Sequence, residues 1–379
     1  YYSKLINLGC HNFGYCIFNG FIRYDLMKKT YQDSIFYLVV FATSYFIYIY
    51  PFEILSDLIL NEKISRQNSF YSTLFVSLLV IYYFRSHNTF FLLKLFVYEG
   101  MGVGFISFWI INLALIISLT NFLNDYQLGI TSLTLIIILS VYGLINARFF
   151  RIKKLFISSS KIKRKYNFVF ISDIHLGTNP VSTLSKVITK INKINYDFLL
   201  IGGDLIDSST FDLKNLKILK SIKKPIFCVT GNHEYYVKNS KEKLSKLILY
   251  NITLLRNENF LFDDINIIGI DDYQTTDNQT KINIDLENKS KFNLTLVHKS
   301  SIWHKIFDNT DLMLAGHTHN GQIFPFNLFV KIKFKYSFGL YRNKNSYLYV
   351  SSGSGCWGPR MRLGTSNEIV NVELIPYKS

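Results

Sequence analysis

The chain has 379 residues, of which 49% are hydrophobic, and its formal net charge is +16. That length allows two or three domains. The four cysteines form no C-x-x-C pair and no evenly spaced framework, which excludes a small disulfide-held fold and fits a reducing compartment.

The first 150 residues are strongly apolar. Four stretches contain no Asp, Glu, Lys or Arg and are long enough, or nearly so, to cross a bilayer: residues 34–52, 67–84, 100–124 and 126–147. We therefore predict a membrane region over residues 1–150 with about four transmembrane helices. The stretch 67–84 is the shortest and lies between Arg66 and Arg85, so a buried or interfacial helix is the alternative there.

Basic residues gather directly after the last apolar stretch. Residues 148–165 contain eight Lys or Arg and no acidic residue, which is half of the net charge. Such a cluster is attracted to anionic lipid, so residues 151–165 are predicted to be a basic juxtamembrane linker, and no specific nucleic-acid partner is expected. Because basic segments stay cytoplasmic, we predict a multi-pass protein of the cell (inner) membrane whose C-terminal domain faces the cytoplasm.

The rest of the chain alternates short apolar runs with amphipathic segments. Strands and helices are expected to alternate in the order strand 167–171, helix 181–194, strand 197–201, helix 212–222 and strand 225–230. This alternation is typical of parallel α/β units. Shorter elements follow: a helix near 240–249, strands at 252–256, 265–270, 293–297, 311–315, 346–351 and 368–374, and a polar loop at 272–289.

Residues of metal-ligand type follow five of these apolar runs. They are Asp173 and His175, Asp204 and Asp207, Asn232 and His233, His298, and His317 with His319. In open α/β sheets, ligands bind at the edge where strands end. Alternate residues of an extended segment point the same way, so Asp173 and His175 can converge on one ion.

Together these blocks resemble the calcineurin-like metallophosphoesterase superfamily. The pattern D-x-H, GD-x-x-D, GNH-E, a lone His and GH-x-H is present in that order between Asp173 and His319, and the resemblance covers about residues 166–375. It implies an α/β fold, namely an αββα sandwich of two mixed sheets flanked by helices, as a phosphoesterase domain over residues 166–379. It also implies a metal-dependent hydrolase.

The resemblance implies a role for each of these residues. Asp173, His175 and His319 would bind a first divalent metal, Asn232, His298 and His317 a second, and Asp204 both; the metals would be Mn, Fe, Zn or Co. His233 would protonate the leaving group or bind a phosphoryl oxygen, and Asp207 would hydrogen-bond His233 and fix its tautomer. Glu234 is either a support for these ligands or merely a charge at a helix N-terminus.

Two features of the sequence narrow the expected class of substrate: a difference from the protein phosphatases of this superfamily and a similarity to one of its membrane-associated branches. Protein serine/threonine phosphatases carry arginine and glycine where Ser208 and Ser209 stand here, so that class is disfavoured. The chain is more similar to the membrane-associated bacterial branch that includes enzymes cleaving the pyrophosphate of UDP-diacylglucosamine. The aromatic and lysine-rich run 324–341 would suit the lipid headgroup level, or would be an ordinary hairpin. Arg360 or Arg362 would bind a substrate phosphate, or be a surface charge.

The function predicted is therefore that of a membrane-anchored two-metal phosphoesterase. It would hydrolyse a phosphodiester or pyrophosphate bond of a lipid-linked substrate by attack of a metal-bridging hydroxide, with the lipid bilayer as partner. Two alternatives stay open: a nucleotide or nucleic-acid phosphodiesterase acting on a soluble substrate, and a non-enzymatic membrane sensor or scaffold. The oligomeric state does not follow from the sequence.

Overall fold

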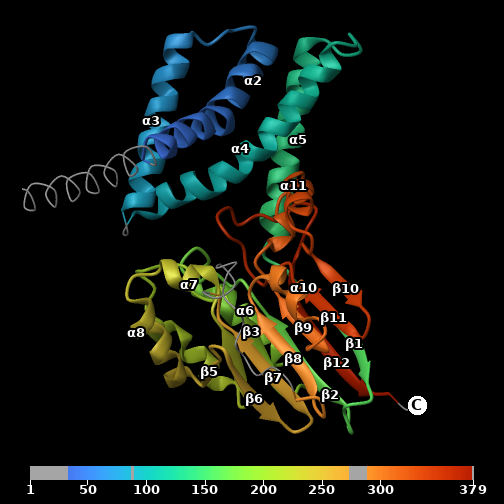
Figure 1. Ribbon diagram of the computed structural model, residues 1–379. Coiled ribbons are helices and arrows are strands. Elements are labelled where there is room, and N and C mark those ends of the chain that lie inside the picture. Colours follow the sequence, from blue (N-terminus) through green and yellow to red (C-terminus); the bar gives the residue numbers. More distant parts are fainter. Residues whose placement is uncertain (1–32, 87–88, 273–287, 378–379) are drawn as a thin grey trace, which may run out of the picture. The chain divides into compact units, whose positions relative to one another are not determined.

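The computed structural model describes residues 33–86, 89–272 and 288–377 (Figure 1). It divides the chain into two compact units, one of residues 1–86 and 107–132 and the other of residues 87–106 and 133–379. The second unit therefore includes the first part of one long helix and the last part of the next. Most of the polar loop predicted at 272–289 lies outside the described residues.

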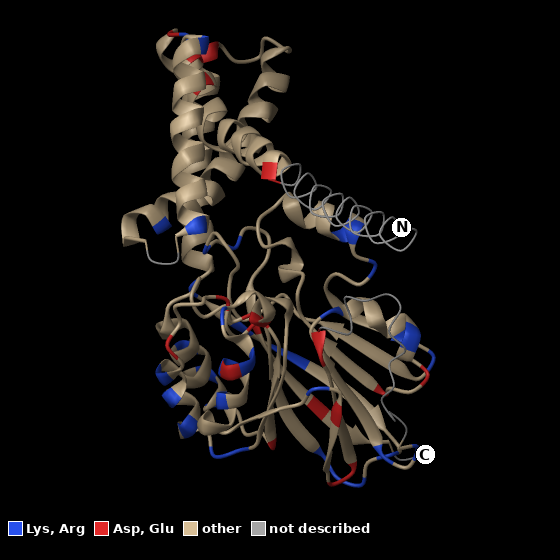
Figure 2. Ribbon diagram, turned by 60° about the vertical axis from the view of Figure 1, so that its left-hand side comes forward, with Lys and Arg blue, Asp and Glu red and all other residues tan. Residues whose placement is uncertain are grey.

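Long apolar helices form in the first 150 residues. They are η1 (Tyr45–Ile49, a π-helix), α2 (Tyr50–Leu60), α3 (Arg66–Arg85), α4 (Phe91–Ser118) and α5 (Asp125–Asn146). Within the described residues, three helical stretches are long and apolar enough to cross a membrane: Asp33–Leu60, α4 and α5. Figure 2 shows long parts of these helices without charged residues.

The fourth predicted span, residues 67–84, is wrong as a span. The segment does form a helix, α3, of 20 residues. Its first turns, however, are polar, with Gln67, Asn68, Ser69, Ser72 and Thr73. These polar side chains make the helix less apolar than a helix that crosses a bilayer.

The catalytic part is built on two six-stranded sheets. The first has the order β1-β12-β2-β3-β4-β5 and the second β10-β11-β9-β8-β7-β6. The first comprises β1 (Phe150–Ser159), β2 (Tyr166–Ile171), β3 (Phe198–Gly202), β4 (Ile226–Val229), β5 (Ile252–Leu254) and β12 (Asn367–Pro376). The second comprises β6 (Glu258–Phe262), β7 (Ile265–Ile270), β8 (Phe292–Val297), β9 (Leu312–Ala315), β10 (Gly339–Asn343) and β11 (Ser346–Val350).

Helices cover the outer faces of both sheets, so the predicted αββα sandwich is confirmed. They are α6 (Val181–Ile191), η2 (Leu213–Ser221), α7 (Asn232–Tyr236), α8 (Ser240–Ser245), η3 (Lys246–Tyr250), η4 (Ser300–Ile302), α10 (Trp303–Ile306), η5 (His319–Gly321) and α11 (Phe326–Lys333). Between the sheets, Phe168 stacks on Phe198 with ring centroids 4.8 Å apart, and both rings are fully buried against apolar residues of the second sheet. This dry core fixes the two sheets against each other and so fixes the loops at their ends.

The predicted basic linker at residues 151–165 is wrong, because most of it is strand β1. The strand pairs with β12 in parallel over ten residues, from Phe150 opposite Asn367 to Ser159 opposite Pro376. Leu155 and Ile157 are buried, while the basic side chains point outward. An edge strand with one solvated face carries lysine and arginine readily, and such charges also prevent edge-to-edge aggregation.

Candidate metal centre

The predicted ligands lie on loops at one edge of the two sheets. In each case the loop directly follows a strand: β2 for Asp173 and His175, β3 for Asp204, β4 for Asn232, β8 for His298, and β9 for His317 and His319. The first three strands belong to one sheet and the last two to the other. The structure thus gathers residues 146 positions apart in sequence at the carboxyl ends of parallel strands, where ligands bind in α/β sheets.

Asp173, His175 and His319 form the first cluster. All three are buried, and one ligand atom of each lies within 4.8 Å of the others. The Nε2 atoms of His175 and His319 are 3.0 Å apart, and Asp173 Oδ1 lies 3.5 Å from His319 Nε2. Two neutral imidazoles that present Nε2 lone pairs to each other repel, so the pair requires a proton or a cation between them. Two imidazoles and a carboxylate are a donor set that fits a divalent transition metal.

Asp204, His298 and His317 form the second cluster. Asp204 Oδ2 lies 3.1 Å from His298 Nε2, which in turn lies 3.2 Å from His317 Nδ1. The same Asp204 oxygen is 3.6 Å from His175 Nε2 of the first cluster. Asp204 therefore faces both clusters, which is the place that a shared carboxylate ligand needs.

The side-chain oxygen of Asn232 is a further atom that could bind a metal at this edge of the sheets. Its Oδ1 is buried and has no hydrogen-bond partner among the described residues. An unsatisfied buried carbonyl oxygen costs free energy, so a native structure supplies a partner. A cation at this edge of the sheets would be such a partner.

The residues of the second cluster shift one another's pKa values in opposite directions. Burial alone would lower the pKa of His298, but the negative charge of Asp204 raises it to about 10. Burial, and then the positive charge of His298, lower the pKa of His317 to about 3. Burial would raise the pKa of Asp204, but the neighbouring histidines, His298 first, hold it well below its usual range. The buried, ionised Asp204 carboxylate is therefore stable only beside a positive charge. A metal ion would supply that charge in place of the proton on His298.

Five of the seven predicted ligands adopt left-handed backbone angles. The φ values are 57° for Asp173, 51° for His175, 50° for Asp204, 77° for His317 and 50° for His319. Non-glycine residues adopt this conformation at a cost, and such strain clusters at functional sites. The loops therefore hold the ligands in positions that the backbone alone would not favour.

Glu234 supports two of these loops from beneath. Its carboxylate accepts hydrogen bonds from the backbone N–H groups of Asp204 at 3.0 Å, Gly231 at 2.7 Å and Ile206 at 2.9 Å. Burial and the charge of Asp204 raise the pKa of Glu234 to about 7. Gly231 lies so close to Asp204 that a Cβ there would collide with the Asp204 carboxylate. Of the two predicted roles for Glu234, the contacts match that of a support.

Asp207 lies near both His175 and His233, with one ligand atom of each of the three residues within 4.8 Å of the others, and its shortest contact is with His175. Its Oδ2 is 3.3 Å from Nδ1 of His175, and its Oδ1 accepts a hydrogen bond from the backbone N–H of Thr178 at 2.9 Å. A carboxylate behind a ligand histidine fixes the ring and raises its basicity. The predicted hydrogen-bond partner was His233, and this is corrected: the Asp207 carboxylate faces Nδ1 of His175, a residue of the first cluster. The sequence could not distinguish the two histidines, because the loop geometry decides which ring faces Asp207.

We expect Asp207→Asn to weaken metal binding without removing a ligand. Loss of a carboxylate behind a ligand histidine typically lowers metal affinity about 10- to 100-fold. The measurement is a Mn²⁺ titration of the purified chain, with Asp212→Asn, an exposed helix cap in the same segment, as the matched control. An affinity equal to that of the unchanged chain would show that Asp207 does not act through His175.

His233 stands at the border of the two clusters. Its backbone N–H donates to Asp204 Oδ1 at 2.9 Å, and its Nε2 lies 4.0 Å from Asp204 Oδ2. The imidazole packs edge-on against His175, with centroids 4.6 Å apart, and its side chain is 17% exposed. His233 therefore lies at the mouth of the site, whereas His175 and His298 are fully buried.

Arg362 is completely buried and is held by the protein itself. Its guanidinium donates to the backbone oxygens of His319 at 2.8 Å, Ser352 at 2.7 Å and Gly355 at 2.6 Å, and to Asn367 Oδ1 at 2.8 Å. These bonds join the loop that carries His319 to the loop after β11. The geometry matches a residue that positions a metal ligand, and it leaves the guanidinium little capacity for a substrate phosphate.

Arg360 is paired instead with an acid of helix α4. Its Nε donates to Glu99 Oε1 at 2.5 Å and its backbone N–H to Glu99 Oε2 at 2.8 Å.

Also on α4, Lys94 donates to the backbone oxygen of Gly177, two residues after His175, at 2.5 Å. Lys94 and Glu99 were not predicted as parts of the site. The sequence does indicate them, since they are the only Asp, Glu, Lys or Arg between residues 86 and 124. Charged residues isolated in an apolar helix usually have a functional role.

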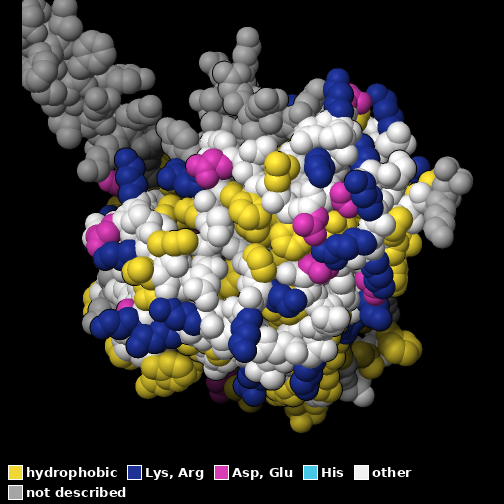
Figure 3. Space-filling model, turned by 90° about the horizontal axis from the view of Figure 1, so that it is seen from below, with side chains coloured by type: hydrophobic (Ala, Val, Ile, Leu, Met, Phe, Trp, Pro, Cys, Tyr) yellow, Lys and Arg dark blue, Asp and Glu magenta, His cyan; other side chains and the backbone are white. Residues whose placement is uncertain are grey.

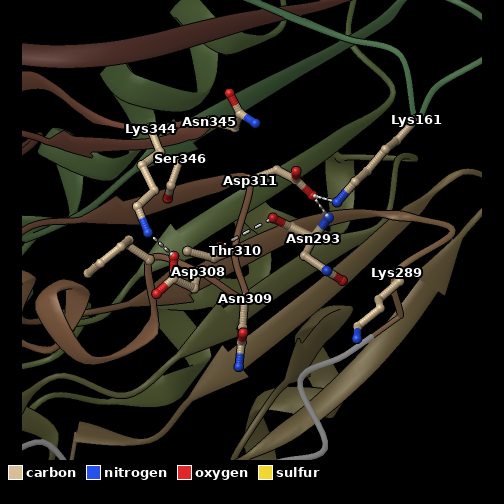
Figure 4. Close-up of a pocket in the computed structure, with 11 residues that line it drawn as sticks. Lys161, Lys289, Asn293, Asp308, Asn309, Thr310, Asp311, Lys344, Asn345 and Ser346 are labelled. Atoms are coloured by element: carbon tan, nitrogen blue, oxygen red, sulfur yellow. Dashed lines mark hydrogen bonds and ion pairs between the residues drawn. The ribbon is translucent and has the colours of Figure 1, made fainter.

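A cavity of about 280 Å³ lies at the opposite ends of the strands (Figure 4). Its lining includes the residues that precede β9 and β11, and two of its lysines are already paired, Lys161 with Asp311 at 2.9 Å and Lys344 with Asp308 at 3.0 Å. On the face shown in Figure 3, basic side chains are dispersed among acidic and apolar ones. This end of the molecule contains none of the predicted ligands.

Comparison with known proteins agrees with this geometry. Residues 166–321 match the family model described as calcineurin-like phosphoesterase. A protein of Campylobacter jejuni named as an uncharacterized metallophosphoesterase is 36% identical over 259 residues, which cover 64% of this chain and 68% of that protein. One of Helicobacter pylori, with the same kind of name, is 35% identical over 60% of this chain and 64% of its own length. A Danio rerio protein named transmembrane protein with metallophosphoesterase domain is 30% identical over 66% of this chain and 63% of its own length.

Proposed function

Since the chain belongs to the calcineurin-like metallophosphoesterases and so is a metal-dependent phosphoesterase, we propose that it cleaves a phosphodiester or pyrophosphate bond of a lipid-linked substrate. The observation that carries the proposal is the contact between the metal-site loop and a long apolar helix. Lys94 and Glu99 of α4 bind the loops of Gly177 and Arg360, and all four residues belong to one compact unit. A site so linked to a candidate membrane span is well placed for a substrate that stays in the bilayer.

Seven residues would hold two divalent cations. Asp173, His175 and His319 would bind the first, Asn232, His298 and His317 the second, and Asp204 both. When bound, such ions stabilise the negative charge of the phosphoryl group and lower the pKa of water. The charge of Asp204 would offset their mutual repulsion, since its Oδ2 lies within 3.6 Å of a histidine of each cluster.

Other residues supply positioning and proton transfer. Asp207 and Glu234 hold His175 and the Asp204 loop, so the ligands need little rearrangement during the reaction. His233 reaches the mouth of the site and would donate a proton to the leaving oxygen as the phosphorus–oxygen bond breaks. Water supplies the new oxygen on phosphorus, and no covalent link to the enzyme is needed.

Helix α11 supports a place at the bilayer surface. Its exposed side chains include Leu328, Phe329 and Ile332, the last of which is 83% exposed, and lysines 331 and 333 lie on the same helix. The ring of Phe326 contacts that of Phe105 on α4, with centroids 6.2 Å apart. An exposed apolar helix with flanking lysines suits the headgroup region of an anionic membrane.

We further propose that the catalytic part faces the cytoplasm. The eight basic residues of 148–165 follow the last candidate span directly, and basic segments stay on that side. With the three candidate spans that the described residues contain, Asp33 at the start of the first would lie on the opposite side of the membrane from the catalytic part. A reporter fused after Ser379 tests this orientation: activity of an alkaline phosphatase reporter, which needs the periplasm, would contradict it.

The function is tested by hydrolysis assays on the detergent-purified chain with added Mn²⁺. We expect cleavage of bis-p-nitrophenyl phosphate to exceed that of p-nitrophenyl phosphate, to stop after treatment with a chelator and to return with Mn²⁺. A pyrophosphate-linked lipid in mixed micelles is then compared with a soluble cyclic nucleotide. Preference for the monoester would indicate a phosphatase, and preference for the cyclic nucleotide would reject the lipid-linked substrate.

A further inference from the structure

We propose that a cavity at the C-terminal end of helix α5 binds the phosphate headgroup of an anionic phospholipid, at a site separate from the metal centre. The cavity has a volume of about 230 Å³, and its lining comes from the end of α5, the first turns of α6, helix α4 and the loop between β11 and β12. These residues all belong to the same compact unit. The lining includes none of the seven proposed metal ligands, so a lipid there would be bound without being hydrolysed.

The charged side chains of the cavity leave it positive. Three of them are basic, namely Arg148, Lys186 and Arg360, and one is acidic, Glu99. Arg360 is paired with Glu99 at 2.5 Å, which cancels one charge of each sign. Among the described residues, the side chains of Arg148 and Lys186 have no hydrogen bond or ion pair. The cavity therefore presents two uncompensated positive charges to a ligand.

Hydroxyl groups lie beside these two cations. Ser182 and Thr183, in the first turn of α6, line the cavity together with Lys186 one turn further along the helix. A phosphate accepts several hydrogen bonds at once, and the planar guanidinium of an arginine donates two of them in parallel. Two cations and two hydroxyls around one small cavity therefore match a phosphate group better than they match an uncharged ligand.

Buried asparagines fix the walls of the cavity. Asn179 Nδ2 donates to the backbone oxygens of Ile174 at 2.9 Å and Cys356 at 2.6 Å. Asn367 Nδ2 donates to the backbone oxygen of Ala147, just past the end of α5, at 2.7 Å. Both asparagines line the cavity and are buried. A ligand that enters it therefore orders little additional chain.

An exposed apolar stripe on α5 ends at Arg148. Val141, Leu144 and Ile145 precede Arg148 by seven, four and three residues, so the four side chains share one helix face. The backbone N–H of Arg148 donates to the oxygen of Ile145 at 3.0 Å, which continues the turn beyond the last residue of α5. Val141 and Ile145 are each 48% exposed, and Leu144 lines the cavity.

This stripe favours a phospholipid over a soluble phosphate. Helix α5 is long and apolar enough to cross a membrane. Acyl chains would lie along the stripe, at the depth of the hydrocarbon, while the phosphate of the same lipid enters the cavity between Arg148 and Lys186. A soluble phosphate would fill the cavity but would leave the stripe uncovered.

The test measures lipid binding by native mass spectrometry on the full chain in a non-ionic detergent. Dioleoyl phosphatidylglycerol, which is anionic, is compared with dioleoyl phosphatidylcholine, which has the same acyl chains and no net charge. Each basic side chain near an anionic lipid contributes a factor of about five in affinity, so the two free cations predict a preference of about 30-fold for phosphatidylglycerol. Arg148→Gln and Lys186→Gln should each reduce the preference about fivefold, and the double variant should abolish it.

A charge-matched control separates the cavity from a general attraction to basic surface. Arg151→Gln combined with Lys193→Gln removes the same two charges from exposed positions outside the cavity, one in β1 and one just past the end of α6. This control should keep the preference. A control that loses as much of the preference as the double variant of Arg148 and Lys186 would overturn the site, and so would equal affinities of the unchanged chain for the two lipids.

Two further comparisons test the kind of ligand and its place. Glycerol 3-phosphate carries the phosphate without acyl chains and should compete far less well than phosphatidylglycerol; equal competition would replace the lipid by a soluble phosphate. Removal of Mn²⁺ with a chelator should leave the affinity for phosphatidylglycerol unchanged, whereas its loss would place the lipid at the metal centre and overturn the separate site. Failure of the chain to cleave bis-p-nitrophenyl phosphate, by contrast, would reject the proposed function and leave this cavity untouched.

Discussion

Replacing Asp204 with asparagine is expected to lower kcat/KM for diester hydrolysis by about 10³-fold or more, the scale on which single groups of a concerted site act. Asparagine keeps the size of the side chain and removes its charge. Asp204 Oδ2 lies 3.1 Å from His298 Nε2 and 3.6 Å from His175 Nε2, so this one charge serves both clusters. Without it, two cations would repel each other with no shared anionic ligand from the protein.

The metal content gives the second readout for Asp204→Asn. We expect the variant to bind less than the full complement of Mn²⁺, as measured by elemental analysis after gel filtration. Asp263→Asn is the matched control, since Asp263 is a 60% exposed carboxylate in the turn before β7 and pairs with surface Arg164. An Asp204→Asn protein with full metal content and unchanged activity would contradict the shared-ligand role.

The fold was predictable where its signals are local. The run before Asp173 is continuously apolar, and β2 begins within one residue of the predicted start; β7 was predicted as 265–270 and is found there. Strands that are buried on both faces are apolar throughout, so their pattern needs no knowledge of partners. The same runs place the ligand residues at the sheet edge, which is why the candidate site was found from sequence.

The remaining parts depend on contacts between distant residues. Strand β1 was missed because its partner β12 lies more than 200 residues away and because its outward lysines and arginines were attributed to a lipid-facing linker. Strands β6 and β10 were missed for a different reason, since each pairs with the next strand along the chain. Strand β6 is largely exposed, so its residues carry no clear apolar alternation. Asp207 shows the same limit within the site, since only the folded loops determine that it faces His175.

Arg362 was the residue whose surroundings the sequence predicted least well. An arginine in the run Pro359-Arg360-Met361-Arg362 is compatible with a surface charge or with a phosphate ligand. The structure buries it completely, among backbone oxygens that follow β9 and β11. Its burial depends on the two loops meeting, which no local pattern encodes.

Truncation of Arg362 to alanine is expected to destabilise the catalytic unit by about 3–5 kcal/mol, as breaking buried charged networks does. The change would leave the backbone oxygens of Ser352 and Gly355 buried without this donor, and the oxygen of His319 with the backbone N–H of Gln322, at 3.1 Å, in place of two donors. For a unit of this size the corresponding fall in apparent Tm is about 10 °C. Thermal unfolding of the detergent-purified chain measures it, with Arg342→Ala on the exposed face of β10 as control.

The variant Arg362→Lys tests whether the positive charge of Arg362 or the hydrogen-bond geometry of its guanidinium stabilises the unit. Arg362→Lys keeps the positive charge, but a single ammonium cannot reproduce the fork that bonds Nε to Asn367 and both Nη atoms to different loops. We therefore expect most of the loss in Tm to remain. Because one of the lost bonds holds the backbone of His319, metal affinity should fall together with stability. A lysine variant with unchanged Tm and metal affinity would mean that charge alone, and not the joining of the two loops, is what Arg362 provides.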